Sequence, residues 1–349
     1  LKKRISVVRG IAKTKGKQAA IFISNTKKVE NTNFYFTPVR ETKNYIYFGV
    51  VLFDGSIAKK IAKIIDGKFN LIFVDTEKKS YLNKKNRIVN VEKTIKQHIK
   101  KSYLRFFKAN DLTVDAAEDF LGVFYKNDIR NLAGKKILII GIGNIGFKLS
   151  LRLIERGCSI KLFRRNQKKL VEICKTINFI KPKGTMAKAL PIKNANDDLH
   201  KFDVIFCAAN NENVLKISKK IKFKKNVLLL DIGKGMFGSE TLNLLSQKGI
   251  SVYRLDVTPS LNKLLESNDT FKDFEKKKTF KVRKINNLRL ISPGLLGQKN
   301  DLIVDNPMQP KFIYGICDGT GDFKRLSENK KIKIAKIVSK KVKRKLLFY

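Results

Sequence analysis

A glycine pattern directly after an apolar run constrains the fold of this chain more than any other feature. The run is Lys136–Ile140, and Gly141–Gly146 (GIGNIG) follows it at the start of a segment with helical spacing. Inside a strand–helix–strand unit, G-x-G-x-x-G is the turn that holds a dinucleotide. Its first glycine turns the chain off the strand, its second leaves the backbone open to a pyrophosphate, and its third lets the helix pack closely on the strand. The pattern predicts five cofactor-binding residues: Gly141, Gly143, Asn144, Ile145 and Gly146.

The order of apolar runs and helical segments predicts the fold class. Between residues 113 and 259, strands are expected at 136–140, 160–163, 204–207, 227–231 and 252–255, with helical segments between them. Uninterrupted apolar strands of this kind belong to a parallel sheet that is covered on both faces. We therefore predict an α/β protein with a doubly wound parallel Rossmann sheet at 113–259. A smaller α/β substrate domain is expected before it, at 1–112, and a C-terminal segment with a basic helix that packs back on the fold is expected at 260–349.

Further elements follow from the same spacing rules. In the first domain, strands are expected at 19–23, 45–53 and 70–74. Helices are expected over 91–107, 113–127 and 214–221, and the basic C-terminal helix over 332–345. Short strands at 288–291 and 302–304 are the readable part of the C-terminal segment.

The charge of the chain is large, and its distribution matters more than its size. Lys and Arg number 75 against 30 Asp and Glu, which gives a net charge of +45. Lysine greatly outnumbers arginine, and the basic residues are spread along the whole chain. Specific nucleic-acid contacts favour arginine, because its guanidinium binds phosphate and guanine in a bidentate manner. We therefore expect a solvated lysine surface and no specific nucleic-acid partner, with non-specific binding of polyanions at low salt.

Other compositional features exclude several classes of protein. The four cysteines lie far apart and there are two histidines, so neither a disulfide scaffold nor a metal site is predicted. No apolar run approaches the roughly 20 residues that a membrane helix needs, so no membrane span is expected. No signal peptide is recognised near residue 1, and a cytoplasmic protein is expected.

The region after the second Rossmann strand indicates which dinucleotide is bound. An NAD site places an acidic residue there to bind the ribose 2′-hydroxyl. This chain has instead Arg164-Arg165, its one pair of adjacent arginines. Guanidinium groups bind a 2′-phosphate well, so Arg164 and Arg165 favour NADP, with NAD as the alternative.

Two further strand ends belong to the expected cofactor site. In a doubly wound sheet, ligands gather at the carboxyl ends of the strands. Ala208 and Asn210 follow the strand at 204–207, and Gly233 follows the strand at 227–231. Small residues would let a nicotinamide ribose lie close to the backbone, and Asn210 would hydrogen bond to it.

Residues 113–170 resemble the nucleotide domain of the shikimate dehydrogenase and glutamyl-tRNA reductase type. A helix with an acid near its start, then Leu-x-Gly-Lys-Lys, the glycine pattern and a basic segment carry the resemblance. That family has a catalytic lysine–aspartate pair. The resemblance places the aspartate at Asp115 and the lysine at Lys78 or Lys79. The Ser-x-Ser and Asn-Val-Thr substrate motifs of the family are missing here, so the resemblance does not extend to shikimate as the substrate.

A weaker resemblance points to D-2-hydroxyacid dehydrogenases. Leu132-Ala133-Gly134-Lys135-Lys136 before the glycine pattern carries it. Those enzymes use a histidine late in the chain as general acid, and no histidine follows His200 here. His200 is expected in a surface loop instead.

These observations lead to one functional prediction and two alternatives. The prediction is an NADP-dependent oxidoreductase that transfers a hydride to or from a hydroxyl, carbonyl or imine carbon of a small polar or anionic metabolite. Lys78 or Lys79 would carry the proton, and Asp115 would tune its pKa. The alternatives are a regulatory protein that binds the dinucleotide without turnover and a polyanion-binding Rossmann protein. A homo-oligomer is compatible with each of them.

Overall fold

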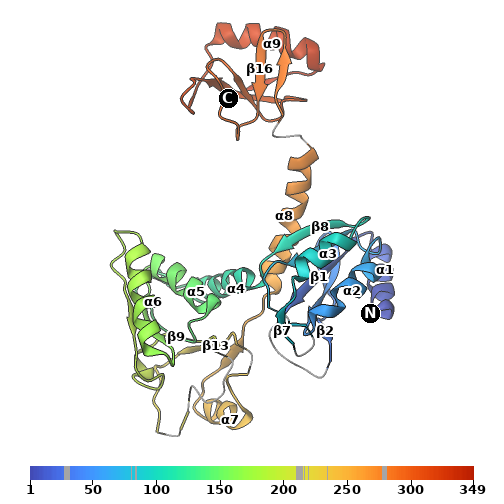
Figure 1. The fold of residues 1–349 in the computed structure, drawn as a ribbon. Coiled ribbons are helices and arrows are strands. Elements are labelled where there is room, and N and C mark those ends of the chain that lie inside the picture. The colour runs from blue at the N-terminus through green and yellow to red at the C-terminus, as the bar shows by residue number, and fades with distance from the viewer. Residues whose placement is uncertain are drawn as a thin grey trace. The chain divides into compact units, whose positions relative to one another are not determined.

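The structure is a computed structural model that describes residues 1–26, 32–79, 81–82, 85–209, 215, 217–218, 220–233, 235–276 and 281–349. Contacts between residues divide the chain into two compact units, Leu1–Lys263 and Leu264–Tyr349. The first unit holds two six-stranded sheets and the two-stranded pair β6-β7, and the second unit holds a third six-stranded sheet (Figure 1). The domain limits at 112 and 259 remain predictions.

The first sheet of the amino-terminal unit has the order β2-β4-β1-β5-β8, with β3 paired to β4. Strands β1, β4, β5 and β8 are parallel, and β2 and β3 run antiparallel to β4. The elements of this region are α1 (Lys2–Thr14), β1 (Gln18–Asn25), β2 (Phe34–Phe36), β3 (Arg40–Glu41), β4 (Tyr45–Leu52), η1 (Gly55–Ile57), α2 (Ala58–Ile65), β5 (Leu71–Asp75), β6 (Tyr81–Leu82), β7 (Lys85–Ile88), α3 (Val91–His98) and β8 (Tyr103–Phe107).

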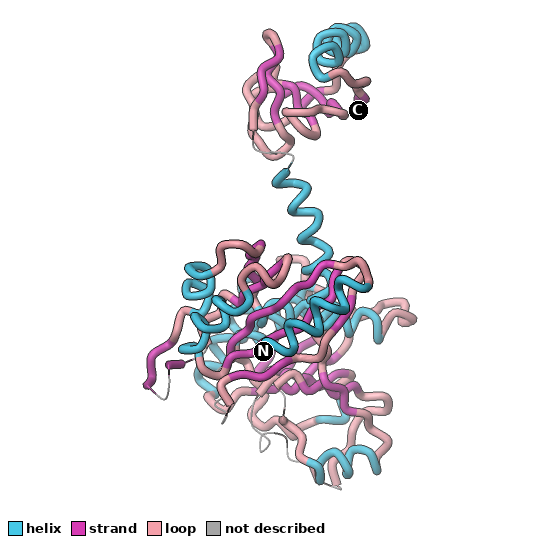
Figure 2. Tube along the Cα trace, turned by 90° about the vertical axis from the view of Figure 1, so that its right-hand side faces the viewer, coloured by secondary structure: helices cyan, strands magenta, loops and turns pink. Residues whose placement is uncertain are grey.

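Both faces of this sheet are buried. Alternate residues such as Ile21, Phe48 and Ile72 pack under α1, α2 and α3 in one hydrophobic cluster, and Figure 2 shows these helices beside the strands. The other face is aromatic, because the rings of Phe22 and Phe73 stack with their centroids 4.7 Å apart. Alternation along a strand sends neighbouring side chains to opposite faces, so a strand buried on both sides is apolar throughout.

The predicted helix over 91–107 is wrong in its second half. Helix α3 ends at His98, and residues 103–107 form β8 beside β5. The Asp66 carboxylate accepts hydrogen bonds from the backbone N–H groups of Lys101 and Ser102, which fixes the turn between α3 and β8. The aromatic-rich sequence of β8 then suits a strand, and pairing with β5 overrides the helical spacing.

The second sheet has the order β11-β10-β9-β12-β13-β14, and all of its strands are parallel. In chain order this is 3-2-1-4-5-6, the arrangement of a doubly wound Rossmann sheet, so the predicted fold class is confirmed. Its elements are α4 (Ala109–Phe124), β9 (Lys136–Ile140), α5 (Asn144–Glu155), β10 (Ser159–Phe163), α6 (Gln167–Ile180), β11 (Ala189–Pro191), η2 (Leu199–Lys201), β12 (Val204–Cys207), β13 (Leu228–Asp231), α7 (Ser239–Gln247) and β14 (Val252–Arg254).

Two separate hydrophobic clusters cover the two faces of the Rossmann sheet. On β9, Ile137 and Ile139 pack in the cluster that also holds residues of α4, α5 and α6. The intervening Leu138 and Ile140 belong to the second cluster, on the other face. This alternation explains why the predicted strand at 136–140 is apolar at every position but the first.

Two helix predictions in this region differ from the structure. Helix α4 begins at Ala109, four residues before the predicted start, because the chain enters it directly from β8. The predicted helix at 214–221 lies partly outside the described residues. The described Ile217, Ser218 and Ile221 are not helical.

The carboxy-terminal unit contains the remaining strands, in the order β15-β16-β17-β18-β19 with β20 paired to β18. Helix α9 packs on its own unit through Ile334 and Val338, which share a cluster with Leu290 and Leu302. Helix α8 leads into the unit, and no helix in the described ranges is long and apolar enough to cross a membrane. The bounds are α8 (Thr258–Lys276), β15 (Arg283–Ile285), β16 (Leu288–Ile291), β17 (Leu302–Val304), β18 (Phe312–Cys317), β19 (Phe323–Lys324), α9 (Glu328–Val342) and β20 (Leu347–Phe348).

Candidate functional site

The glycine turn between β9 and α5 is tightly packed at its first and third glycines. Gly141 has a φ of +96°, and a Cβ there would lie 2.6 Å from the backbone nitrogen of Ala209. A Cβ on Gly146 would meet the carbonyl oxygen of Gly141. Both positions therefore require glycine. Gly141 needs it for its positive φ and for the close approach of Ala209, and Gly146 needs it because a Cβ would clash with the backbone of Gly141.

The second glycine of the turn faces open space. A Cβ on Gly143 would find nothing within 4 Å. Gly143 is also the residue before α5, and no side chain caps that helix. The first N–H groups of a helix without a side-chain cap, together with the helix dipole, favour an anion. The turn is thus packed where the chain must bend and open where a pyrophosphate would lie.

The other two residues predicted in the turn have different surroundings. Asn144 is exposed, and its Oδ1 atom accepts a hydrogen bond from Asn110. Ile145 is partly buried and packs against the hydrophobic cluster of α4, α5 and α6. Ile145 therefore anchors the helix, while Asn144 is accessible.

Arg164 and Arg165 follow β10, whose last residue pairs with the last residue of β9. The Arg164 guanidinium donates a hydrogen bond of 2.8 Å to the carbonyl oxygen of Ile142, inside the glycine turn. Arg165 is exposed. The structure thus places one guanidinium against the turn and the other at the surface next to it.

The strand ends beyond β9 are also close to the glycine turn. The backbone nitrogen of Ala208 donates to the carbonyl oxygen of Ile140, and Gly233 donates to the carbonyl oxygen of Cys207, at 2.8 and 2.9 Å. Asn210 lies outside the described residues. Cys207 itself is fully buried, and burial raises the pKa of its thiol, so it stays a neutral core residue.

A polar cluster occupies the carboxyl ends of β1 and β5 in the first sheet. Asp75 ends β5 and is 1% exposed. Its Oδ2 atom lies 3.4 Å from the Nζ atom of Lys79, which also pairs with Glu77. Asn25 ends β1, donates to Asp75 at 3.3 Å, and accepts from the backbone nitrogen of Lys79 at 2.8 Å. Asn25, Asp75, Glu77 and Lys79 are called the Lys79 cluster below.

Burial sets the electrostatics of this cluster. Removal from water raises the pKa of the Asp75 carboxyl above its ordinary value, while the Lys79 ammonium and backbone hydrogen bonds from Glu77 and Ala109 oppose the rise. A buried carboxylate is stable only when paired and hydrogen bonded. Asp75 thus holds Lys79 at a fixed place on the sheet edge.

Helix α4 connects the Lys79 cluster to the glycine turn. The backbone nitrogens of Ala109 and Asn110 donate to Asp75 and Glu77 at 3.3 and 3.1 Å. The Asn110 side chain donates to Oδ1 of Asn144 at 3.3 Å. One residue therefore contacts both the cluster and the glycine turn.

The structure brings together only part of the predicted catalytic set. Lys79 is in the cluster, and Lys78 is exposed. Asp115 lies about one helical turn beyond Asn110 in α4. Its carboxylate pairs with the guanidinium of Arg152 in α5 at 2.5 Å. The carboxylates beside Lys79 are Asp75 and Glu77, so Asp115 is placed to join α4 to α5.

Sequence reasoning missed Asn25, Asp75, Glu77 and Asn110. Asn25 and Asp75 stand at the carboxyl ends of strands that were predicted, and ligands gather at such ends, so a signal was present. No pattern in the sequence pointed to Asn110, because the helix was expected to begin at residue 113. Among the described residues, no group of three or more His, Cys, Asp or Glu side chains could hold a metal ion.

Comparison with known proteins finds a family that resembles the part of the chain with the glycine turn. Residues 124–234 match the family model for shikimate / quinate 5-dehydrogenase. The glutamyl-tRNA reductase of Thermosipho melanesiensis is 30% identical over 102 residues, which are 29% of this chain and 26% of that protein. The chain thus spans about a quarter of the length of this curated relative.

Two solved structures are similar at low scores. The L-tryptophan dehydrogenase of Nostoc punctiforme matches at a TM-score of 0.40 and 12% identity, over 71% of this chain and 72% of that chain. A shikimate dehydrogenase solved in complex with NADP+ matches at a TM-score of 0.38 and 14% identity, over 69% of this chain and 85% of that chain. It is the match of residues 124–234 to the shikimate / quinate 5-dehydrogenase family model that shows the resemblance predicted for the Rossmann part of the chain.

Proposed function

We propose that residues 1–263 form an NADP-dependent oxidoreductase that acts on a hydroxyl, carbonyl or imine carbon of a small polar metabolite. The observation that carries the proposal is the bond from Asn110 to Asn144, because it joins the Lys79 cluster to the glycine turn. A proton-transferring group and a dinucleotide site must lie together for such a reaction. The match of residues 124–234 to a dehydrogenase family supports the same reaction class.

The glycine turn would hold the dinucleotide. Gly143 leaves room for the pyrophosphate, and the start of α5 offers N–H groups to it. Arg164, with Arg165 beside it, would bind the 2′-phosphate, and no carboxylate stands next to β10 at this point to select a free 2′-hydroxyl. Ala208 and Gly233 would leave space along the strand ends, and Asn210 remains a predicted contact.

The bound dinucleotide supplies the hydride acceptor or donor. Lys79 would donate a proton to the substrate oxygen or nitrogen as the carbon gains a hydride, and would take it back in the reverse direction. Asp75 and Glu77 would hold the ammonium, and Asn25 would fix the backbone of Lys79. A small substrate with a polar or anionic group fits this lysine better than an apolar one.

The test is an assay that follows the absorbance of the reduced nicotinamide with a panel of small hydroxy, keto and imino acids. The wild-type chain should turn over at least one of them with NADP. Lys79→Met should lower that turnover by at least about 10²-fold and keep NADPH binding, whereas Lys78→Met, a change of the neighbouring exposed lysine, should keep both. Equal turnover by wild type and Lys79→Met would contradict the proposal.

A further inference from the structure

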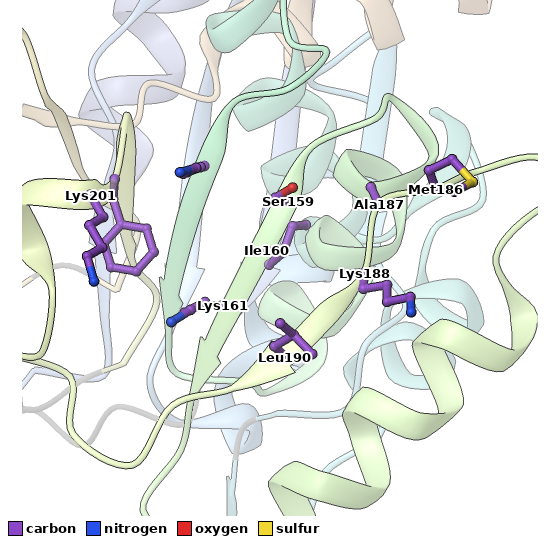
Figure 3. Close-up of a pocket in the computed structure, with 10 residues that line it drawn as sticks. Ser159, Ile160, Lys161, Met186, Ala187, Lys188, Leu190 and Lys201 are labelled. Carbon is purple, nitrogen blue, oxygen red and sulfur yellow. The ribbon is translucent and has the colours of Figure 1, made fainter.

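A hollow on the Rossmann sheet lies at the edge opposite the glycine turn. It has a volume of ≈ 400 Å³ and is formed by the first residues of β9 and β10, the chain around the start of β11, and the end of the connection to β12. Figure 3 shows the side chains that line it. A concave site of this size suits a small molecule. The proposed oxidoreductase reaction does not use it.

The floor of the hollow is apolar. Phe202 is 2% exposed and belongs to the hydrophobic cluster on this face of the sheet, while Leu190 and Met186 remain 49% and 88% exposed. In the connection between β11 and β12, residues 192–203 form only the short turn η2, so no full helix covers this part of the sheet. Large apolar side chains are therefore left facing water around a concave surface, which is typical of a binding site.

The rim of the hollow is positively charged. Four lysines line it, and in Figure 3 Lys188 and Lys201 lie on opposite sides of Leu190. Lys201 pairs with Asp198 at 2.9 Å, and Lys161 lies 4.0 Å from the same carboxylate. Lys136 and Lys188 have no ion pair within the described part of the chain. Two of the four lysines share the Asp198 carboxylate and the other two have no such partner, so the rim carries an excess of positive charge.

We propose that this hollow binds a small amphipathic anion, a molecule with an apolar body and one acidic group. The apolar body would cover Leu190 and Met186, which removes their exposed surface from water. The acidic group would lie near Lys136 and Lys188, whose charges are not neutralised by the protein. An anion without an apolar body would be held only by its attraction to the lysines. An apolar molecule without a charge would be held only by the burial of apolar surface.

A fluorescent anion tests the apolar part of the proposal. The probe is 8-anilinonaphthalene-1-sulfonate, titrated into the full chain. Saturable binding of one probe per chain is expected. Leu190→Asp should weaken it by about tenfold or more, because a carboxylate would replace the apolar wall. The matched control is Val171→Asp, which places the same charge on an exposed position of α6 outside the hollow and should leave the affinity within about twofold.

Charge reversal on the rim tests the second part. The double variant Lys136→Glu/Lys188→Glu should weaken the probe by about tenfold, and the loss should shrink as salt is added. The control Lys175→Glu/Lys183→Glu changes the net charge equally at exposed positions outside the hollow. Octanoate should compete with the probe, while inorganic phosphate at the same ionic strength should not.

Three results would overturn the proposal. Equal weakening by both members of either pair would show binding to the general positive charge or to other apolar surface. If binding does not saturate near one probe per chain, the probe binds non-specifically and not at a single site in the hollow. If sedimentation velocity finds a dimer that Leu190→Asp dissociates, the hollow is an interface between two copies and not a ligand site. Melting curves of each variant distinguish these outcomes from loss of the fold.

Discussion

The two six-stranded sheets of the amino-terminal unit build their sites in different ways. The Rossmann sheet uses one continuous motif, Gly141–Gly146, in which neighbouring residues take different tasks. The first sheet assembles its polar cluster from Asn25, Asp75 and Lys79, which are far apart or separated by a turn in the chain. A motif of the first kind can be recognised in a sequence. A cluster of the second kind exists only once parallel strands have aligned their ends.

The largest expected effect on cofactor binding is at Gly143. Gly143→Asp should weaken NADPH binding by roughly 100-fold, or about 2.8 kcal/mol, because a carboxylate would face the pyrophosphate. The fold should persist, since a Cβ at this position meets nothing within 4 Å. Gly184→Asp is the matched control, because that glycine also has open space around it. Fluorescence titration of NADPH measures both, and equal affinities would refute the cofactor site.

The next effect concerns Lys79 in the first sheet. Lys79→Met should lower the turnover number by about 10²- to 10⁴-fold, because a general acid or base usually accelerates a reaction by this factor. Lys78→Met should change it by less than about twofold, as surface substitutions do. The comparison uses any substrate found with the panel above. If Lys78→Met has the larger effect, the cluster is structural and the exposed lysine carries the proton.

A smaller effect is expected for the choice of cofactor. Arg164→Ala/Arg165→Ala should weaken NADPH binding by about 10- to 100-fold, because charge-assisted hydrogen bonds to the 2′-phosphate would be lost. NADH has no such phosphate and should bind nearly as before. Arg130→Ala, at an exposed site on another loop, is the control. A uniform loss for both dinucleotides would mean that Arg164 only supports the glycine turn through Ile142.

The smallest expected effect is on the free energy of unfolding. It measures what the Lys79 cluster contributes to the stability of the fold, independently of its part in the reaction. Burial raises the pKa of Asp75 in the folded chain, so the folded state binds this proton more tightly than the unfolded state. The unfolding free energy therefore loses this contribution as the pH rises from the ordinary carboxyl pKa through the raised one. Asp75→Asn should remove that loss and therefore be the more stable protein at neutral pH.

Denaturant unfolding at several pH values measures this difference. The advantage of Asp75→Asn should vanish in acid, where Asp75 is protonated in both states. A variant that is less stable at every pH would show that the carboxylate stabilises the fold through Lys79 and Asn25 more than burial destabilises it.

The sequence predicted the Rossmann sheet well because its strands carry their own signals. Lys136–Ile140 is apolar on both faces, and the glycines that follow fix its end. In the first sheet, residues 103–107 had helical spacing, and only their pairing with β5 makes them a strand. Likewise the partner of Lys79 could not be found by family pattern alone, since Asp115 pairs with Arg152 while Asp75, at the end of β5, lies four residues before Lys79.

The central claim is that the open turn at Gly143 holds the diphosphate of NADPH next to the guanidinium of Arg164. Isothermal titration calorimetry of NADPH and NADH with the wild-type chain tests it most directly. One NADPH should bind per chain and more tightly than NADH. The absence of heat with either dinucleotide, under conditions where the chain is folded, would contradict the account.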